Sequence, residues 1–208
     1  MAVVSNGTTL IDAGALGASA GAGKLTLIKT LTASSSSTLS FVHGASSVVF
    51  DGTYDSYEFH LININIASNS SGEFGFKLST DSGSNYNSGK TNSYLACNNA
   101  ENGGYEALSY AGSFSTSNET GSTRISHNNG EDSDECFSGY LKFYKPADTT
   151  FVKHFISECG NPSFDGTPEC QHMLTSGFAT TSSAINAIQF LPDGGNFDGV
   201  IKLYGIGG

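Results

Sequence analysis

The sequence predicts an all-β fold: an antiparallel β-sandwich, jelly-roll-like, with an extended N-terminal arm. Composition is the first reason, because Gly, Ser, Thr and Asn are abundant and only 13% of the residues are charged, about half the usual share. Such residues suit strands and turns, whereas soluble helices usually carry Lys and Glu on their outer faces. Periodicity is the second reason, because apolar and polar residues alternate over many short segments and no helical period persists. Two packed antiparallel sheets would bury such strands.

The N-terminal residues 1–23 are expected to form a flexible arm, and residues 24–208 a single β-sandwich domain. The arm is rich in Gly, Ala and Ser, which does not favour a packed element. Its apolar residues Leu10, Ile11 and Leu16 are candidates for docking on a neighbouring protein.

In the first half of the domain, alternation predicts strands over 24–31, 38–42, 57–66 and 73–79. Leu25 and Leu27 are expected to face inward in the first strand, and 33–37 to form a turn or loop. The third strand is the clearest, with one continuously apolar face from Ile62 onward. A turn rich in Ser, Asn and Gly separates it from the fourth strand, so these two are expected to pair as an antiparallel hairpin.

The middle of the domain is less regular. Short strands are expected over 94–97 and 105–110, and residues 113–134 are expected to form an exposed polar loop with one strand near 124–126. The last third is strongly patterned again, with strands expected over 137–144, 151–157, 173–180, 184–191 and 200–204. The segment 158–169 carries two Gly and two Pro residues and is expected to be a loop.

Charge excludes several classes of partner. The chain has a formal net charge of −10 and a pI near 4.7, whereas nucleic-acid binding needs a basic surface that displaces counterions. The same charge argues against docking on anionic lipid. No apolar stretch is long enough to span a membrane and no signal peptide is evident, so we expect a protein made in a cytoplasm, without nucleic-acid or membrane partners.

Motifs with catalytic associations occur only in unsuitable contexts. Residues 17–21 read Gly-x-Ser-x-Gly, but the strand and helix that must flank a nucleophile elbow are not predicted there. Gly23-Lys24 lacks the spacing of a phosphate-binding loop, and the acidic run 131–135 lacks the glycine of an EF-hand. The histidines are scattered, and most Asp and Glu residues fall in turns. A carbohydrate-active enzyme, which would need a cleft with two facing carboxylates, is the alternative that the sequence leaves open. We therefore expect no enzymatic activity and no cofactor.

The four cysteines leave alternatives open. Cys97, Cys136, Cys159 and Cys170 are widely spaced, unlike the close pairs of structural zinc sites. A zinc site built from Cys159, Cys170, His172 and His154 and a disulfide between Cys159 and Cys170 are both conceivable. Free thiols are the ordinary alternative in a protein made in a cytoplasm.

Four tyrosines in the central loops and strands are the best candidates for a contact surface. They are Tyr86, Tyr94, Tyr105 and Tyr110. Tyrosine is enriched at protein interfaces and can stack on sugars. The alternative is that several of these side chains complete the core.

Much of the chain resembles a group of virion proteins of marine tailed phages. The resemblance rests on 57–66 with 74–78, and on 138–146, 151–156, 181–190, 199–206 and the start 8–12. It is weakest between about 95 and 135. It concerns the residue pattern of these segments and their order along the chain, not a catalytic signature. It implies a structural component of the virion, attached to the capsid or to the tail, with no enzymatic activity and no cofactor.

Two placements on a virion follow from this resemblance. The first is a capsid decoration or cement protein. This role is compatible with a short chain that has one domain, an N-terminal arm with scattered apolar residues, and no coiled-coil heptads. Its partners would be the major capsid protein or other virion proteins, and it would be a homo-oligomer, with a trimer as one option. A tail fibre or receptor-binding protein that recognises a host glycan is the alternative, because loops rich in Tyr, Asn and Ser suit such binding.

Overall fold

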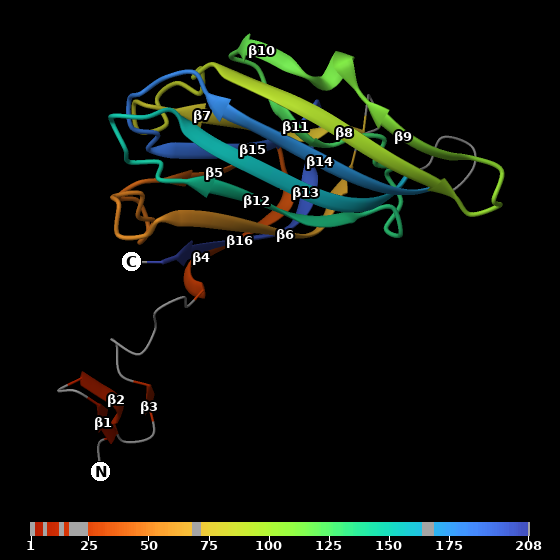
Figure 1. Ribbon diagram of the computed structural model, residues 1–208. Helices are drawn as coiled ribbons and strands as arrows, with labels where there is room; N and C mark the ends of the chain where they lie inside the picture. Colours follow the sequence, from red (N-terminus) through yellow and green to blue (C-terminus); the bar gives the residue numbers. More distant parts are fainter. Residues whose placement is uncertain are drawn as a thin grey trace.

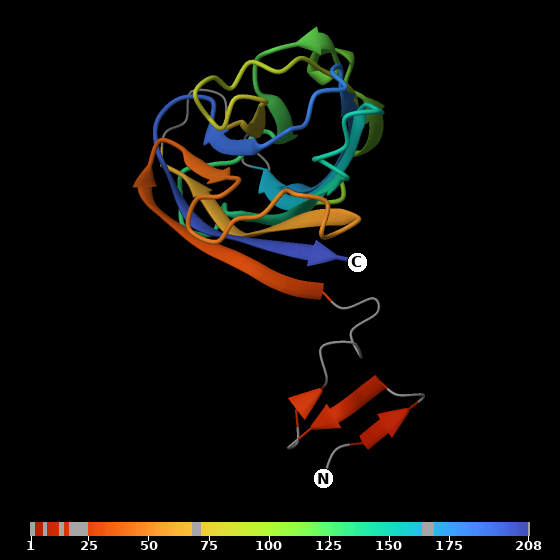
Figure 2. The same cartoon turned by 90° about the vertical axis from the view of Figure 1, so that its left-hand side faces the viewer.

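The described part of the chain is built from antiparallel β-sheets (Figure 1), which confirms the predicted all-β sandwich. The computed structural model describes residues 3–5, 8–12, 15–16, 25–67, 72–163 and 169–207. A large sheet and a smaller one face each other across a shared core, and the large sheet curves around the small one (Figure 2). The described residues contain no helix whose length and hydropathy would let it span a membrane.

The large sheet has nine strands. In spatial order they are β10 (Thr116–Glu119), β8 (Lys90–Ala100), β14 (Glu169–Ala179), β13 (Lys153–Ser163), β12 (Phe137–Tyr144), β6 (Ser56–Ile66), β16 (Phe197–Ile206) and β4 (Leu25–Ser36), with β9 (Glu106–Tyr110) also paired to β8. The small sheet has the order β11 (Thr123–Ser126), β7 (Phe74–Ser79), β15 (Ala187–Pro192) and β5 (Leu39–Val42). One short 3-10 helix, Gly112–Phe114, lies between β9 and β10.

Phenylalanine dominates the core between the two sheets. Phe190 of β15 lies with its ring centroid 5.2 Å from that of Phe59 in β6 and 6.2 Å from that of Phe41 in β5, and all three side chains are fully buried. Tilted and edge-to-face ring pairs of this kind add about 0.5–1.5 kcal/mol each to the burial energy. Because strand side chains alternate between faces, the inner face of the large sheet covers this core and its outer face remains available for other contacts.

β6 contains a β-bulge at Asn63 that the alternation of the sequence does not reveal. Asn63 has φ +48°, and the registers of both neighbouring strands shift close to it. Leu61 faces the core before the bulge and Ile64 faces it afterwards. The prediction of one apolar face from Ile62 onward is therefore wrong, because the extra residue changes which alternate positions point inward.

The predicted hairpin between β6 and β7 is also wrong. β6 pairs with β12 and β16 in the large sheet, whereas β7 pairs with β11 and β15 in the small one. The two strands are consecutive in sequence but belong to opposite layers. Each strand has a mostly buried face that packs into the same core. The apolar residues of the two strands therefore face each other between the layers and are not neighbours in one sheet.

The first strand of the domain faces opposite to expectation. Leu25 and Leu27 are 43% and 53% exposed, whereas Ile28 and Leu31 pack against the core. Leu203 and Tyr204 of β16 pair with Lys29 and Leu27, so Ile28 is an extra residue in β4 that reverses the alternation before it. β4 also continues to Ser36, through the segment expected to be a turn.

Two predicted loops contain strands instead. Within 113–134 the strand expected near 124–126 is confirmed as β11, and the structure adds β10; Thr123 and Ile125 of β11 are buried, so this part is not an exposed loop. Within 158–169 most residues extend β13 and β14 into a long antiparallel pair. Pro162 is tolerated because it lies past the last residue that β12 pairs with, so among the described strands β13 pairs only with β14 at that point.

The N-terminal segment forms a small sheet, not only an extended arm. β1 (Val3–Ser5), β2 (Thr8–Asp12) and β3 (Ala15–Leu16) pair in sequence order and antiparallel. The sequence between β1 and β2 is Asn6-Gly7, a dipeptide typical of hairpin turns. This signal could have predicted the hairpin.

Candidate functional site

The outer face of the large sheet carries a group of interacting polar and aromatic side chains. We name it the outer-face array and define it as Glu58, His60, Tyr140, Glu158, His172 and Tyr204. Its members come from strands β6, β12, β13, β14 and β16. All belong to alternate positions that point away from the core, so the array exists because five neighbouring strands share one register.

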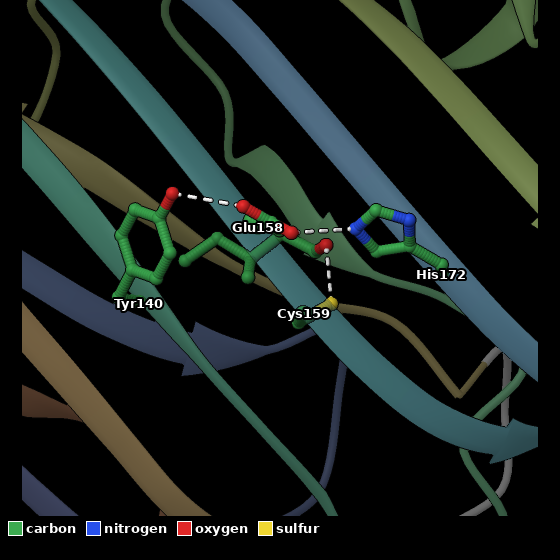
Figure 3. Close-up of polar contacts among 5 residues, drawn as sticks. Tyr140, Glu158, Cys159 and His172 are labelled. Atoms are coloured by element: carbon green, nitrogen blue, oxygen red, sulfur yellow. Dashed lines mark hydrogen bonds and ion pairs between the residues drawn. The ribbon is translucent and has the colours of Figure 1, made fainter.

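Glu158 is the centre of the best-defined contact in the array (Figure 3). The Tyr140 hydroxyl donates a hydrogen bond to Glu158 Oε2 over 2.8 Å, and His172 Nε2 lies 2.8 Å from Glu158 Oε1. The three residues stand on three adjacent strands, and Tyr140 lies directly across from Glu158. Both carboxylate oxygens are therefore engaged.

These contacts shift the pKa values of two members of the outer-face array. The hydrogen bond from Tyr140, followed by that with His172, lowers the pKa of the Glu158 carboxyl below its ordinary value. The same hydrogen bond to Glu158 raises the pKa of Tyr140 to about 12. Glu158 therefore stays ionised and Tyr140 stays protonated over the whole physiological range.

A second contact lies on the neighbouring strands of the same face. His60 Nε2 lies 2.7 Å from Glu58 Oε1, and the His60 ring centroid lies 4.8 Å from that of Tyr204. His60 is directly opposite Tyr140, so this pair continues the row of contacts across the sheet. The array is thus a surface whose side chains contact one another through hydrogen bonds and ring packing.

A recess of about 510 Å³ is the other candidate site, lined by β7, β11 and the segment around β10. Arg124 of β11 forms an ion pair with Glu73, and its guanidinium carbon lies 4.0 Å from the ring centroid of Phe114. The rest of the lining includes the carboxylates of Glu119 and Asp193 and the hydroxyls of Ser113, Ser115, Thr116, Ser117 and Ser122. This mixture of an aromatic ring, an ion pair and hydroxyls is of the type that binds neutral polar ligands.

Behind the recess, a buried polar pair supports Phe114. The His127 ring centroid lies 4.8 Å from that of Phe114, and His127 Nδ1 is 3.0 Å from the Tyr94 hydroxyl. Burial, with a smaller effect of Arg124, lowers the pKa of His127 to about 4. The neutral imidazole is therefore part of the packing.

The structure separates the four candidate tyrosines. Tyr94 is fully buried, so its prediction as a surface contact is wrong, and it belongs to the core as the alternative reading expected. Tyr105 and Tyr110 are 51% and 62% exposed, at and beside strand β9. Tyr86 is half-buried in the loop before β8. Tyr105 and Tyr110 are therefore the two exposed members of the set, at opposite ends of β9.

The candidate contact residues of the N-terminal segment are placed only by their backbone. Leu10 and Ile11 belong to β2 and Leu16 to β3. Their side chains lie outside the described structure, so their docking role remains a prediction.

The disulfide between Cys159 and Cys170 is contradicted. All four cysteines are free. Cys159 is buried and donates its thiol to the Ile125 carbonyl over 3.1 Å, whereas Cys170 is exposed. Cys159 lies opposite Met173, so Cys170 is offset by about 10 Å along the strands, too far for a disulfide.

The proposed metal ligands are not brought together. No group of three or more His, Cys, Asp or Glu side chains that could hold a metal occurs within the described residues. Within the acidic run 131–135, Glu135 is buried and its carboxylate accepts the backbone N–H of Asp132 over 2.9 Å. This carboxylate closes the loop on itself.

Sequence reasoning missed the outer-face array. Glu158 and His172 fall in or next to a segment that its Gly and Pro content marks as a loop, although it is a strand pair. Tyr140 was correctly expected on a strand face, but the alternation alone does not tell which strands are neighbours. Comparison of the chain with protein-family models, with curated proteins and with solved structures found no match.

Proposed function

We propose that this chain is a non-enzymatic structural protein of a virus particle, and that it decorates the head of a tailed phage and reinforces contacts between capsid subunits. The non-enzymatic part of the proposal is supported by the direction in which the pKa values of reactive side chains are shifted. Burial raises the pKa of the Cys159 thiol to about 12, although the thiolate is the nucleophile. Tyr140 is held protonated and Glu158 ionised, each by the other, so they are not poised for proton transfer near neutral pH.

Lys90 is shifted in the opposite, activating direction, but its position argues against chemistry. Burial lowers its pKa to about 8. The side chain is fully buried, and its ammonium donates to the Ser88 carbonyl over 3.1 Å. No substrate could reach it without opening the sandwich.

The surface of the molecule suits a contact role. The outer-face array presents aromatic and charged groups on a broad face, and aromatic residues are enriched at interfaces. The N-terminal strands form a separate sheet with an apolar sequence and are the candidate attachment to the major capsid protein or another virion protein. The resemblance to marine phage virion proteins points the same way.

The test is the location and copy number of the protein on purified virions, determined by electron microscopy with a specific label. We expect a regular lattice of copies over the head. Label confined to the tail vertex would contradict decoration, and absence from the particle would contradict any virion role.

A tail protein that binds a host glycan is the second candidate, and the recess beside Arg124 is the observation that favours it. Sugar hydroxyls can pair with the carboxylates and hydroxyls of the recess, whose lining also includes Phe114. A glycan array probed with the full chain tests this role. Binding that is lost on Glu119→Gln but kept on Glu106→Gln, outside the recess, would support it.

A further inference from the structure

Strand β9 is an unprotected edge of the large sheet. β8 is the one described strand with which it pairs, and four of its five residues are exposed. Leu108 is 75% exposed, the highest value among the exposed large apolar residues of the described chain. Natural edges often carry charged side chains, Pro or a bulge that prevents pairing with another chain, whereas Glu106–Tyr110 carries a single charge, at Glu106, and no Lys, Pro or bulge.

The backbone of β9 offers hydrogen-bonding groups on its open side. The residues that flank the strand bond inward: the Ala100 N–H donates to the Tyr105 carbonyl over 2.9 Å, and the Ala111 N–H donates to the Tyr94 carbonyl over 3.0 Å. In an antiparallel strand the direction alternates from residue to residue. Glu106, Leu108 and Tyr110 therefore point their N–H and C=O groups away from β8.

The side chains of these same residues lie on the outer face of the sheet. Tyr110 lies opposite Leu95 and Leu108 opposite Cys97, both on the exposed side of β8. Leu95 is itself 38% exposed. An apolar strip therefore reaches the edge at the point where the backbone is unpaired.

We propose that β9 pairs with β9 of a second copy of this chain, antiparallel about a twofold axis at Leu108, so that the two large sheets become one continuous sheet. This register pairs all five residues and matches every outward-pointing backbone group with another. Leu108 then faces Leu108 of the second copy, and Glu106 faces Tyr110. Such an interface is isologous, with the same patch used by both copies.

A second copy fits this edge better than an unrelated partner because the strand is complementary to itself. Each copy has a net charge of −10, so broad contact between two copies would be repulsive. The strand pairing brings one carboxylate per copy, Glu106, into the interface and places it opposite a tyrosine hydroxyl that can donate to it. This pairing is independent of where the protein is attached on a virion.

The oligomeric state of the full chain in solution tests the proposal. A five-residue strand pair is a small interface, so we expect a concentration-dependent monomer–dimer equilibrium in the micromolar to millimolar range, measured by sedimentation velocity. Leu108→Lys places two like charges across the axis and is expected to weaken association about tenfold or more. Leu27→Lys, at a similarly exposed leucine on the opposite edge strand β4, is the matched control and should leave the dimer intact.

A backbone-specific variant and an exchange measurement keep the test decisive. Leu108→Pro removes an N–H that has no partner among the described residues of one copy, so it should abolish the dimer while the monomer keeps its melting temperature. In the unmodified chain, amide exchange at Glu106, Leu108 and Tyr110 should slow as concentration rises. A chain that stays monomeric up to about 1 mM, or a dimer that both Leu108 variants leave unchanged, would overturn the proposal.

Discussion

Individual titratable residues in this protein are shifted for two different physical reasons. His127 is displaced mainly by burial, which disfavours its charged form. Tyr140 is displaced mainly by its hydrogen bond to an ionised carboxylate, Glu158. Burial acts on the folded state as a whole, whereas a hydrogen bond can be removed with one substitution. The two residues therefore call for different experiments.

We expect His127 to make the protein less stable in mild acid. Its pKa is about 4 in the folded chain against an ordinary value of 6.5, so between these values the unfolded chain binds a proton that the folded chain does not. The free energy of unfolding should fall as pH drops from 6.5 to about 4, and this contribution should stop changing below that. When the free energy of unfolding is measured with urea at several pH values, it should depend less on pH for His127→Gln than for the unmodified chain. An equal pH dependence would contradict the assignment to His127.

Glu158→Gln should bring the pKa of Tyr140 down from about 12 towards the ordinary value of 10, because the charged acceptor is lost while the side chain keeps its size. The titration of Tyr140 can be isolated as the difference in phenolate absorbance between the chain and its Tyr140→Phe variant. The raised pKa stabilises the fold fully below pH 10, and this stabilisation is lost as pH rises through about 12. An unchanged Tyr140 titration in the Glu158→Gln variant would mean that burial is the main cause.

At the scale of strands, the sequence predicts which segments form strands more successfully than it predicts which strands are neighbours. Alternation located β6, β7, β12 and β15 because each must bury one face. It could not assign β6 and β7 to different sheets, because the same pattern suits a hairpin and a pair of facing layers. The long pair β13–β14 was missed because Gly and Pro usually end strands, and only the absence of a second neighbour makes Pro162 acceptable.

The same limit applies to the candidate site. Tyr105 and Tyr110 are exposed, as a contact surface requires, and their contact role stays a prediction. Tyr94 has the same local signature, and only the packing of Phe114 and His127 over it places it in the core. Contacts across strands, such as that of Glu158 with His172, depend on registers between segments that are not adjacent in the sequence.

The bulge in β6 allows a sharp test at this scale. Asn63 has φ +48°, a left-handed backbone that Asn and Gly tolerate and β-branched residues do not. Asn63→Val should destabilise the protein by about 1–2 kcal/mol, which is about 2–8 °C in Tm. Asn63→Gly is the matched control and should change Tm little. Equal Tm values for the two variants in thermal unfolding would show that the bulge is not fixed by this residue.

At the scale of the whole molecule, the protein has a large curved sheet but few charged residues. The outer face and the edges of this sheet are the main exposed surfaces, and only 13% of the residues carry charge. Solubility then depends on the net charge of −10, because self-repulsion acts between whole molecules. Specific contacts are therefore expected where acidic residues are few and apolar ones exposed, as along β9, and not over the whole surface.

The last prediction concerns the N-terminal segment, whose described strands pair with one another in a sheet of their own. A chain lacking residues 1–23 should therefore keep the sandwich, with a Tm within about 2 °C of the full chain, a difference that corresponds to less than about 1 kcal/mol. If the segment attaches the protein to a capsid, the same truncation should abolish binding to particles stripped of the protein, measured by co-sedimentation. Leu10→Asp in the full chain should weaken binding without truncation. A truncated chain that folds and still binds would contradict the attachment role, and one that loses its melting transition would show that the segment is part of the folded domain.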